Sequence, residues 1–417
     1  ILMKKIAFIL IVVVFAGCQS KPNLSANKER YEYQMLSPLD TNTLPNIPQN
    51  GGSGVLVREA LNGDLIWQIA RYPLVWQDFL AESIEQMMQA IYFFTHHYYV
   101  GIPCAYWSQK PNGDSLLVSG QVYLPKNRKL NGIMIANHYM MTSNPEVPTN
   151  MTAMETIFLM KDYAIIMPDY VGYGLSRDET HPFLHWRNAA HTAVDLLYCM
   201  PDLLDYYGYE YPKDVVIEGY SQGASVALGV ARLLEETNSE WTIRKLYAGA
   251  GPYNPALSYD YCVAHDVVGI PSLIPLLIIG MNDAYDLNLN MEDVFLEPLL
   301  SNYEEWVCSK SYPMKEIDQL MGSYRMSELM KTPWMNRDDS TTRLLYNVLL
   351  DNSNVGYDLQ SPAYFIHSLD DELVPLYNTL ILMENMPDNS QIEYDFQHYG
   401  THMETSIAFL KAVFQDL

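Results

Sequence analysis

A serine lies between two glycines in the stretch "IEGYSQGASV", residues 217–226. This G-x-S-x-G pattern follows the apolar run "DVVIE" and precedes a run with helical spacing. A serine at such a strand-to-helix turn is held in a strained backbone conformation that exposes its hydroxyl oxygen. Gly219 and Gly223 fit this interpretation, because the turn leaves no room for side chains beside it. The pattern predicts that Ser221 is a nucleophile rather than one more small residue in a tight turn.

A serine hydroxyl is a poor nucleophile unless a base takes its proton and a carboxylate orients that base. Where this turn carries a catalytic serine, the acid and then the histidine follow it along the chain. The candidate acids are Asp370 and Asp371 in "HSLDDELVP". Asp371 is favoured because it begins a D-x-x-V-P arrangement that ends at Pro375, and Asp370 stays open as the alternative.

The candidate bases are His398 and His402, which both follow the last predicted strand. His402 opens the final amphipathic helix, a position from which it can reach over the edge of the sheet. His398 lies directly after the strand, where a packed or exposed structural histidine is the alternative. His402 is therefore predicted to be the base. The upstream histidines violate the chain order; they are His138, His181, His185 and His191.

The negatively charged oxygen that forms during attack on a carbonyl needs hydrogen-bond donors. One predicted donor is the backbone N–H of Gln222, at the start of the helix after the serine. The second should come from the loop after the apolar run "GIMIAN", where the backbone N–H of Tyr139 or of Met140 is the candidate. The sequence leaves the choice between these two open.

The elements that must position these residues can be predicted from hydrophobic patterns. Short apolar runs alternate with helical patterns, which predicts a mostly parallel sheet covered by helices on both faces. The Asn-Gly of "KPNGD" predicts a hairpin before the first parallel strand. A helix is also expected near 76–94, and Pro201 is expected to interrupt the helix at 188–207. The predicted strands are 132–137, 163–167, 214–218, 243–248, 363–367 and 392–396, and the other helices are 152–161, 224–236, 376–384 and 405–414.

The alternation stops at about residue 251 and resumes after 357, so this segment is interpreted as an inserted, mainly helical cap. Its most apolar stretch is "IPSLIPLLIIGM", residues 270–281, in which Pro271 and Pro275 are expected to prevent a regular helix through the start. This stretch either lines an acyl pocket over Ser221 or forms the cap's own core. The predicted organisation is a signal peptide at 1–17, a tether and N-terminal extension at 18–97, the core at 98–250 and 358–417, and the cap at 251–357.

The first residues predict export and lipid attachment. Lys4 and Lys5 precede an apolar stretch that is well short of the ~20 residues needed to span a bilayer. The stretch ends in "FAGC", which resembles the bacterial lipobox and makes Cys18 the predicted lipidation site. Gln19 rather than an aspartate follows, which favours an outer-membrane lipoprotein on the periplasmic face, with surface exposure left open.

Composition excludes some partners. A formal net charge of −24 and a pI of about 4.6 argue against binding to nucleic acid. No metal site or cofactor is predicted, because a serine nucleophile with a base and an orienting carboxylate needs neither, and no cysteine has a metal-type spacing. The sequence leaves the oligomeric state open. It also does not decide between disulfides and buried free thiols for the cysteines of the exported part, which are Cys104, Cys199, Cys262 and Cys308.

Several motifs together resemble the α/β-hydrolase superfamily, and within it the secretory lipase family of fungal triacylglycerol lipases and bacterial relatives. They are "PDYVGYGLS", "GYSQG", the cap inserted after the next strand, "LDDELVP" and "GTH", and the resemblance runs from about residue 98 to the C-terminus. It implies an α/β-hydrolase fold and hydrolysis of a small-molecule ester by a triad of Ser221, Asp371 and His402. Many relatives have His-Gly where this chain has His138-Tyr139, which leaves the second oxyanion donor uncertain.

Two other functions remain as alternatives. A prolyl-peptidase-like hydrolase would share the same core, but such enzymes usually carry a large gating domain, for which the short N-terminal segment leaves no room. A non-catalytic binding lipoprotein could have kept the fold, and the complete Ser–Asp–His order counts against it.

Overall fold

A computed structural model describes residues 56–57, 99–150, 153–337, 339–386 and 391–417. The predicted signal peptide, Cys18 and the predicted helix near 76–94 lie outside the described residues, as does the predicted tether apart from Leu56–Val57. Among the described residues, no helix combines the length and the apolar character needed to cross a bilayer.

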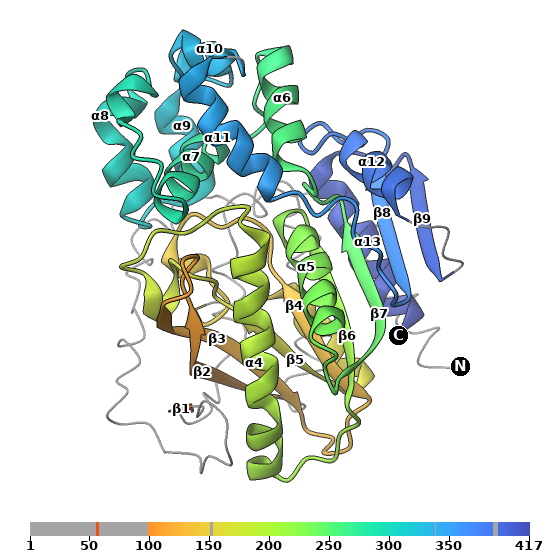
Figure 1. Ribbon diagram of the computed structural model, residues 1–417. Helices are drawn as coiled ribbons and strands as arrows, with labels where there is room; N and C mark the ends of the chain where they lie inside the picture. The colour runs from red at the N-terminus through yellow and green to blue at the C-terminus, as the bar shows by residue number, and fades with distance from the viewer. Residues whose placement is uncertain (1–55, 58–98, 151–152, 338, 387–390) are drawn as a thin grey trace, which may run out of the picture.

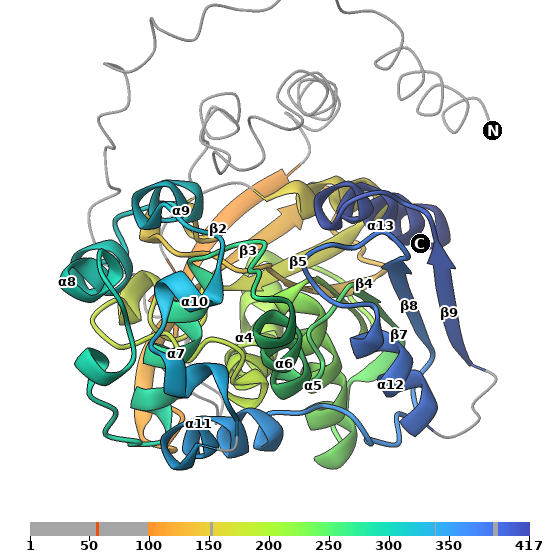
Figure 2. The same cartoon turned by 90° about the horizontal axis from the view of Figure 1, so that it is seen from above.

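Within the described residues, a nine-stranded sheet forms the centre of the molecule, in the order β1-β2-β3-β5-β4-β6-β7-β8-β9 (Figures 1 and 2). The pairings from β1 to β5 are antiparallel, and all pairings from β5 through β4 to β9 are parallel. The mostly parallel sheet predicted from the alternating pattern is confirmed. The strands are β1 (Leu56–Val57), β2 (Tyr99–Gln109), β3 (Ser115–Pro125), β4 (Gly132–Asn137), β5 (Tyr163–Pro168), β6 (Asp214–Tyr220), β7 (Thr242–Gly249), β8 (Ala363–Ser368) and β9 (Ile392–Gln397).

The predicted hairpin joins β2 to β3. Its turn is closed by hydrogen bonds between Lys110 and Asp114 and from the Gly113 N–H to the Lys110 carbonyl. Gly113 has a φ of 88°, a conformation that glycine adopts without steric cost. The Asn-Gly pair therefore predicts this turn correctly.

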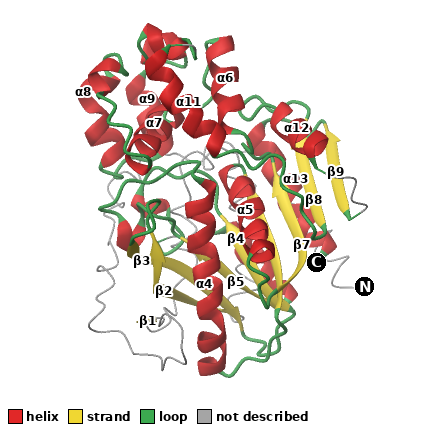
Figure 3. Cartoon of the chain, viewed as in Figure 1, coloured by secondary structure: helices red, strands yellow, loops and turns green. Residues whose placement is uncertain are grey.

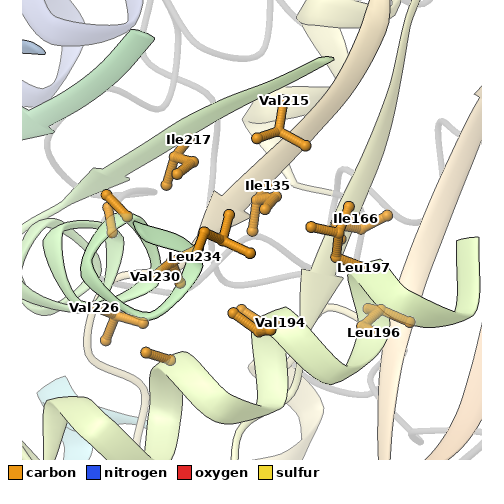
Figure 4. Close-up of a cluster of buried hydrophobic side chains, with 14 of the residues drawn as sticks. Ile135, Ile166, Val194, Leu196, Leu197, Val215, Ile217, Val226, Val230 and Leu234 are labelled. Atoms are coloured by element: carbon orange, nitrogen blue, oxygen red, sulfur yellow. The ribbon is translucent and has the colours of Figure 1, made fainter. Parts of the chain in front are cut away.

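Helices cover both faces of the sheet (Figures 1 and 3). One face packs against α4 and α5, and Figure 4 shows aliphatic side chains of these helices, such as Val194 and Val230, meeting Ile135 and Ile217 of the strands. The other face packs against α13 and the 3₁₀ helix η4 through residues such as Phe158 and Phe409. The first face is covered by α4 (Trp186–Tyr207), α5 (Gln222–Glu236) and α12 (Tyr377–Asn385), which contributes Leu382. The second is covered by α13 (His402–Asp416) and η4 (Met154–Lys161).

The predicted interruption of a helix at Pro201 is wrong. Pro201 does not interrupt α4, which runs continuously over 22 residues. A proline removes one backbone hydrogen bond, but Leu197, Leu203 and Leu204 around it are buried against the sheet, and this packing keeps the helix in register. The helix predicted at 152–161 is present over its described part, residues 154–161, as a 3₁₀ helix.

Further helices lie between β7 and β8 and form a layer over the end of the sheet where α5 begins (Figure 1). We call this layer the cap. It has a hydrophobic cluster of its own, which also takes in Met140, Phe183 and Leu184 from loops of the core. Its helices are α6 (Pro255–His265), α7 (Leu273–Ala284), α8 (Leu299–Tyr303), α9 (Met314–Met321), α10 (Met326–Leu329) and α11 (Ser340–Asp351).

The apolar stretch 270–281 forms most of α7. Pro275 lies in the first turn of this helix, where backbone N–H groups have no intrahelical partner. The expectation that it prevents a regular helix is therefore wrong. Leu276 and Leu277 are each only 6% exposed and belong to the cap's own cluster. The packing favours the interpretation of this stretch as cap core over that of an acyl pocket.

This packing leads to a stability prediction. Leu277→Asp should lower the free energy of unfolding by roughly 3 kcal/mol or more, because it removes a buried side chain and buries a carboxylate without a partner. Leu344→Asp in α11 is the control, since Leu344 is 51% exposed and its replacement should change stability little. Thermal denaturation of both variants measures the difference. An equally stable Leu277→Asp protein with an altered acyl-chain preference would instead assign α7 to the pocket.

Candidate active site

Ser221 lies between β6 and α5 in the conformation expected of a nucleophile at a sharp turn. Its backbone has φ 57° and ψ −124°, a strained combination for a residue with a side chain. The Ser221 N–H donates to the Gly249 carbonyl at 2.8 Å, and the Ser221 carbonyl accepts from the Ala224 N–H at 2.9 Å. The surrounding backbone therefore holds the strained geometry in place.

The two glycines of the motif are required by close backbone contacts. A Cβ atom at Gly219 would lie 2.1 Å from the Gly223 carbonyl oxygen, and one at Gly223 would lie 1.9 Å from the Asn137 carbonyl oxygen. Neither distance is sterically possible. Their absence of side chains lets α5 fold back over β6 and brings its first turn against the end of β4.

Asp371 and His402 are brought together as the sequence predicts. The Asp371 Oδ2 atom lies 2.7 Å from His402 Nδ1, and the two side chains are 0% and 3% exposed. The other oxygen, Oδ1, accepts the backbone N–H groups of Leu373 and Val374, each at 2.9 Å. The loop after β8 therefore holds one oxygen of the carboxylate. The His402 imidazole, at the start of α13, contacts the other oxygen.

The charge state of this pair follows from its surroundings. Burial alone favours the neutral carboxyl group, but the electrostatic attraction of the adjacent His402 and His367 rings, with the hydrogen bond from His402, outweighs it and holds the pKa of Asp371 well below its usual range. An ionised Asp371 accepts the Nδ1–H of His402, which leaves Nε2 free to take a proton. In the described part of the chain, this Nε2 is buried and has no hydrogen-bond partner.

His402 lies beside the serine turn. Its ring packs against Tyr220, the residue before Ser221, with ring centroids 5.0 Å apart. The Tyr220 hydroxyl also donates to the His402 carbonyl at 2.5 Å. His402 begins α13, whose start is stabilised by reciprocal hydrogen bonds between Thr401 and Glu404. These contacts hold the predicted base against Tyr220, the residue that precedes the predicted nucleophile.

The two alternative candidates pair with each other in solvent. His398 Nδ1 lies 2.9 Å from the carboxylate oxygens of Asp370, and the side chains are 74% and 47% exposed. Exposed pairs of this kind contribute little to stability. The chain therefore carries a buried acid–histidine pair and, one residue before its acid, an exposed acid that forms a second pair.

The upstream histidines that chain order excludes as bases include two buried ones near the site. Burial lowers the pKa of His181 to about 3 and that of His138 to about 4, so both rings are neutral at physiological pH. His181 Nδ1 lies 2.8 Å from the Val171 carbonyl and must donate to it, so Nε2 accepts from the Gln222 side-chain amide at 3.3 Å. His181 thus anchors the residue that follows the serine, a role that sequence order does not reveal.

The predicted oxyanion donors lie on two adjacent segments. Gln222 is the first residue of α5, so its backbone N–H has no partner within the helix. The loop 138–141 meets this turn, because the Asn137 and His138 carbonyls lie closest to Gly223. Met140 of this loop is buried in the cap cluster, and the Met141 carbonyl accepts the Tyr173 hydroxyl at 2.5 Å. Tyr139 and Met140 both remain candidates for the second donor.

A further histidine contacts the acid and was missed by the sequence argument. His367 is fully buried at the end of β8, with Nε2 3.3 Å from Asp371 Oδ2. The signal that could have revealed it is its place four residues before Asp371, at the end of the strand from which the acid's loop leaves.

The described residues contain no disulfide. Cys104, Cys199, Cys262 and Cys308 are all free thiols there. Burial raises the pKa of Cys199 to about 12 and that of Cys262 to about 11, so these two stay protonated and unreactive.

Proteins of known structure share the fold of this chain. No protein-family model and no curated sequence matches the chain, whereas solved structures match its fold. A ligand-bound form of the rice cell wall degrading esterase LipA from Xanthomonas oryzae matches with a TM-score of 0.66 and 16% identity, over 87% of this chain and 95% of that chain. The chain has the α/β-hydrolase fold. Candida antarctica lipase A also matches it, with a TM-score of 0.58 and 14% identity, over 77% and 76% of the two chains.

Proposed function

We propose that this α/β-hydrolase-fold protein is a serine hydrolase that cleaves carboxylic esters. The observation that carries the proposal is the buried Asp371–His402 pair beside a strained serine on the turn from β6 to α5. The similarity of the fold to an esterase and a lipase supports the ester as the bond that is cleaved. The motifs shared with the secretory lipase family point the same way.

The proposed reaction uses only groups of the chain. Ser221 Oγ attacks the ester carbonyl while His402 Nε2 takes its proton, and Asp371 stabilises the imidazolium that forms. Backbone N–H groups of Gln222 and of Tyr139 or Met140 stabilise the oxyanion. Collapse of the tetrahedral intermediate breaks the C–O bond, and the leaving alkoxide takes the proton from His402. Water then attacks the acyl-enzyme by the same steps and releases the acid.

The test is a panel of p-nitrophenyl esters of increasing acyl length, run beside aminoacyl p-nitroanilides and with Ser221→Ala as the control. Ester turnover that disappears in the folded control supports the proposal. Turnover of anilides without turnover of esters would favour a prolyl-peptidase-like enzyme. A folded wild-type protein that turns over nothing, and does not react with a fluorophosphonate probe, would favour a binding protein.

The proposal includes attachment to a membrane through a lipid on Cys18. The basic residues, the short apolar stretch and the "FAGC" sequence support it, and the tether after Cys18 would place the enzyme at the periplasmic face of the outer membrane.

Cys18→Ala should move the protein from the membrane fraction to the soluble fraction without a loss of specific activity, because the cysteine carries the only covalent anchor that the proposal invokes. Cys308→Ala is the matched control, since Cys308 is an exposed free thiol in the cap and its replacement should leave the distribution unchanged. Cell fractionation with immunodetection gives the measurement. A Cys18→Ala protein that stays in the membrane fraction contradicts the lipid anchor.

A further inference from the structure

One carboxylate oxygen of the acid contacts two imidazole rings. Asp371 Oδ2 lies 2.7 Å from His402 Nδ1 and 3.3 Å from His367 Nε2. His367 comes from β8 and His402 from α13, so the two rings reach the same oxygen from different elements. Both His367 and the Asp371 carboxylate are completely shielded from solvent. In such a low-dielectric setting, a donor group near the carboxylate acts strongly on its charge.

The protonation of the His367 ring follows from its neighbours. Nε2 also lies 3.0 Å from the Val374 carbonyl, and a carbonyl and a carboxylate can only accept, so Nε2 carries a hydrogen. Nδ1 lies 2.7 Å from the Thr379 hydroxyl, which can donate to it. The Val374 N–H meanwhile donates to Asp371 Oδ1 at 2.9 Å. Val374 therefore ties the histidine and the carboxylate into one rigid unit.

We propose that His367 is a positioning residue that weakens the pull of Asp371 on His402 and so sets the base strength of the catalytic histidine. The inference rests on the proposed function, because it concerns the same acid–base pair. His367 Nε2 lies 3.3 Å from the Asp371 oxygen that accepts the Nδ1–H of His402. The His367 N–H donates to the Val374 carbonyl, and its dipole offsets part of the negative charge on the nearby Asp371 oxygen. Less charge is then left to stabilise the imidazolium that His402 forms when it takes the serine proton.

In the described part of the chain, two other groups contact His402, and neither reduces the negative charge on Asp371 Oδ2. Glu372 accepts the backbone N–H of His402 at 3.0 Å, and Tyr220 contacts its ring and its carbonyl. Burial keeps the Tyr220 hydroxyl protonated by raising its pKa well above the usual value. Glu372 favours the imidazolium and acts in the opposite direction to His367. Removal of His367 should therefore strengthen the pull of Asp371 on the His402 imidazolium.

The experiment is the pH dependence of kcat/KM for an activated ester, whose acidic midpoint reports the free enzyme's base. His367→Leu removes the donor and should move this midpoint to higher pH by about one unit, the size of shift that one neighbouring polar contact produces. His367→Gln keeps an N–H donor and should stay near the wild-type midpoint. Thr379→Val frees the ring from its Nδ1 partner and should move the midpoint in the same direction by a smaller amount. His398→Ala, in the exposed pair, is the control and should not move it.

A residue with a merely structural role would change the height of the profile and not its midpoint. An unchanged midpoint in His367→Leu, or an equal shift in His398→Ala, would overturn the inference. Titration of the His402 ring by nitrogen NMR in Ser221→Ala, with and without the His367 changes, measures the same shift without turnover. If the wild-type protein hydrolyses no ester, the proposed function fails, while the NMR shift still supports or overturns the coupling. Should His367→Leu not fold, the comparison of Thr379→Val with wild type decides.

Discussion

Ser221→Ala and His402→Ala should each lower kcat on an activated ester by about 10³-fold or more, and the double variant should lose little beyond the worse single variant. The two side chains act as a unit, because the hydroxyl is a useful nucleophile only while the imidazole takes its proton. The structure supplies the conditions for both roles. Ser221 is held at φ 57°, and His402 Nε2 is buried with no partner among the described residues.

The control for this prediction is His398→Ala. His398 lies in the same loop region, but its side chain is 74% exposed and pairs with Asp370, so its replacement should leave kcat nearly unchanged. Initial rates and thermal denaturation of all the variants separate lost chemistry from lost folding. A folded His402→Ala enzyme with near-normal activity, together with an inactive His398→Ala enzyme, would move the base to the exposed pair.

The fold could be predicted because each layer leaves a local periodic signal. Central parallel strands such as β4 and β5 are short apolar runs buried along their whole length, and the helices between the strands carry apolar faces toward the sheet. The continuous helix through Pro201 could not be predicted in this way. The rule that proline breaks a helix is local, whereas the burial of Leu203 and Leu204 beside it depends on tertiary packing.

The predicted site residues have two kinds of signal. Ser221 lies in a five-residue pattern whose two glycines are required, because a Cβ atom at either would lie less than 2.5 Å from a backbone carbonyl oxygen. Asp371 and His402 follow this pattern in the required order. The supporting residues have no such pattern. His181 reaches Gln222 across 41 positions, and the contact between His367 and Asp371 depends on how the loop after β8 turns back. Only the folded chain shows which of several histidines touch the site.

The acid gives the sharpest comparison, because the two candidates are adjacent in the chain. Asp371→Asn should lower kcat by on the order of 10³- to 10⁴-fold. The amide oxygen must take the place of Oδ1, which accepts two backbone N–H groups from Leu373 and Val374. The amide nitrogen then faces His402 Nδ1 and the His367 Nε2–H. A donor in that place forces Nδ1 to accept and puts the proton on Nε2, where His402 can no longer take one from Ser221.

Asp370→Asn is the matched control, since it makes the same chemical change one residue earlier. Its carboxylate is 47% exposed and, within the described part of the chain, pairs only with the solvent-facing His398. We therefore expect kcat to change less than about twofold and stability by at most a few tenths of a kcal/mol. Steady-state kinetics on one ester, with thermal denaturation of both variants, measures the contrast. The reverse result would make Asp370 the acid, and the buried contact of Asp371 with His402 would then serve only to hold the loop after β8 against α13.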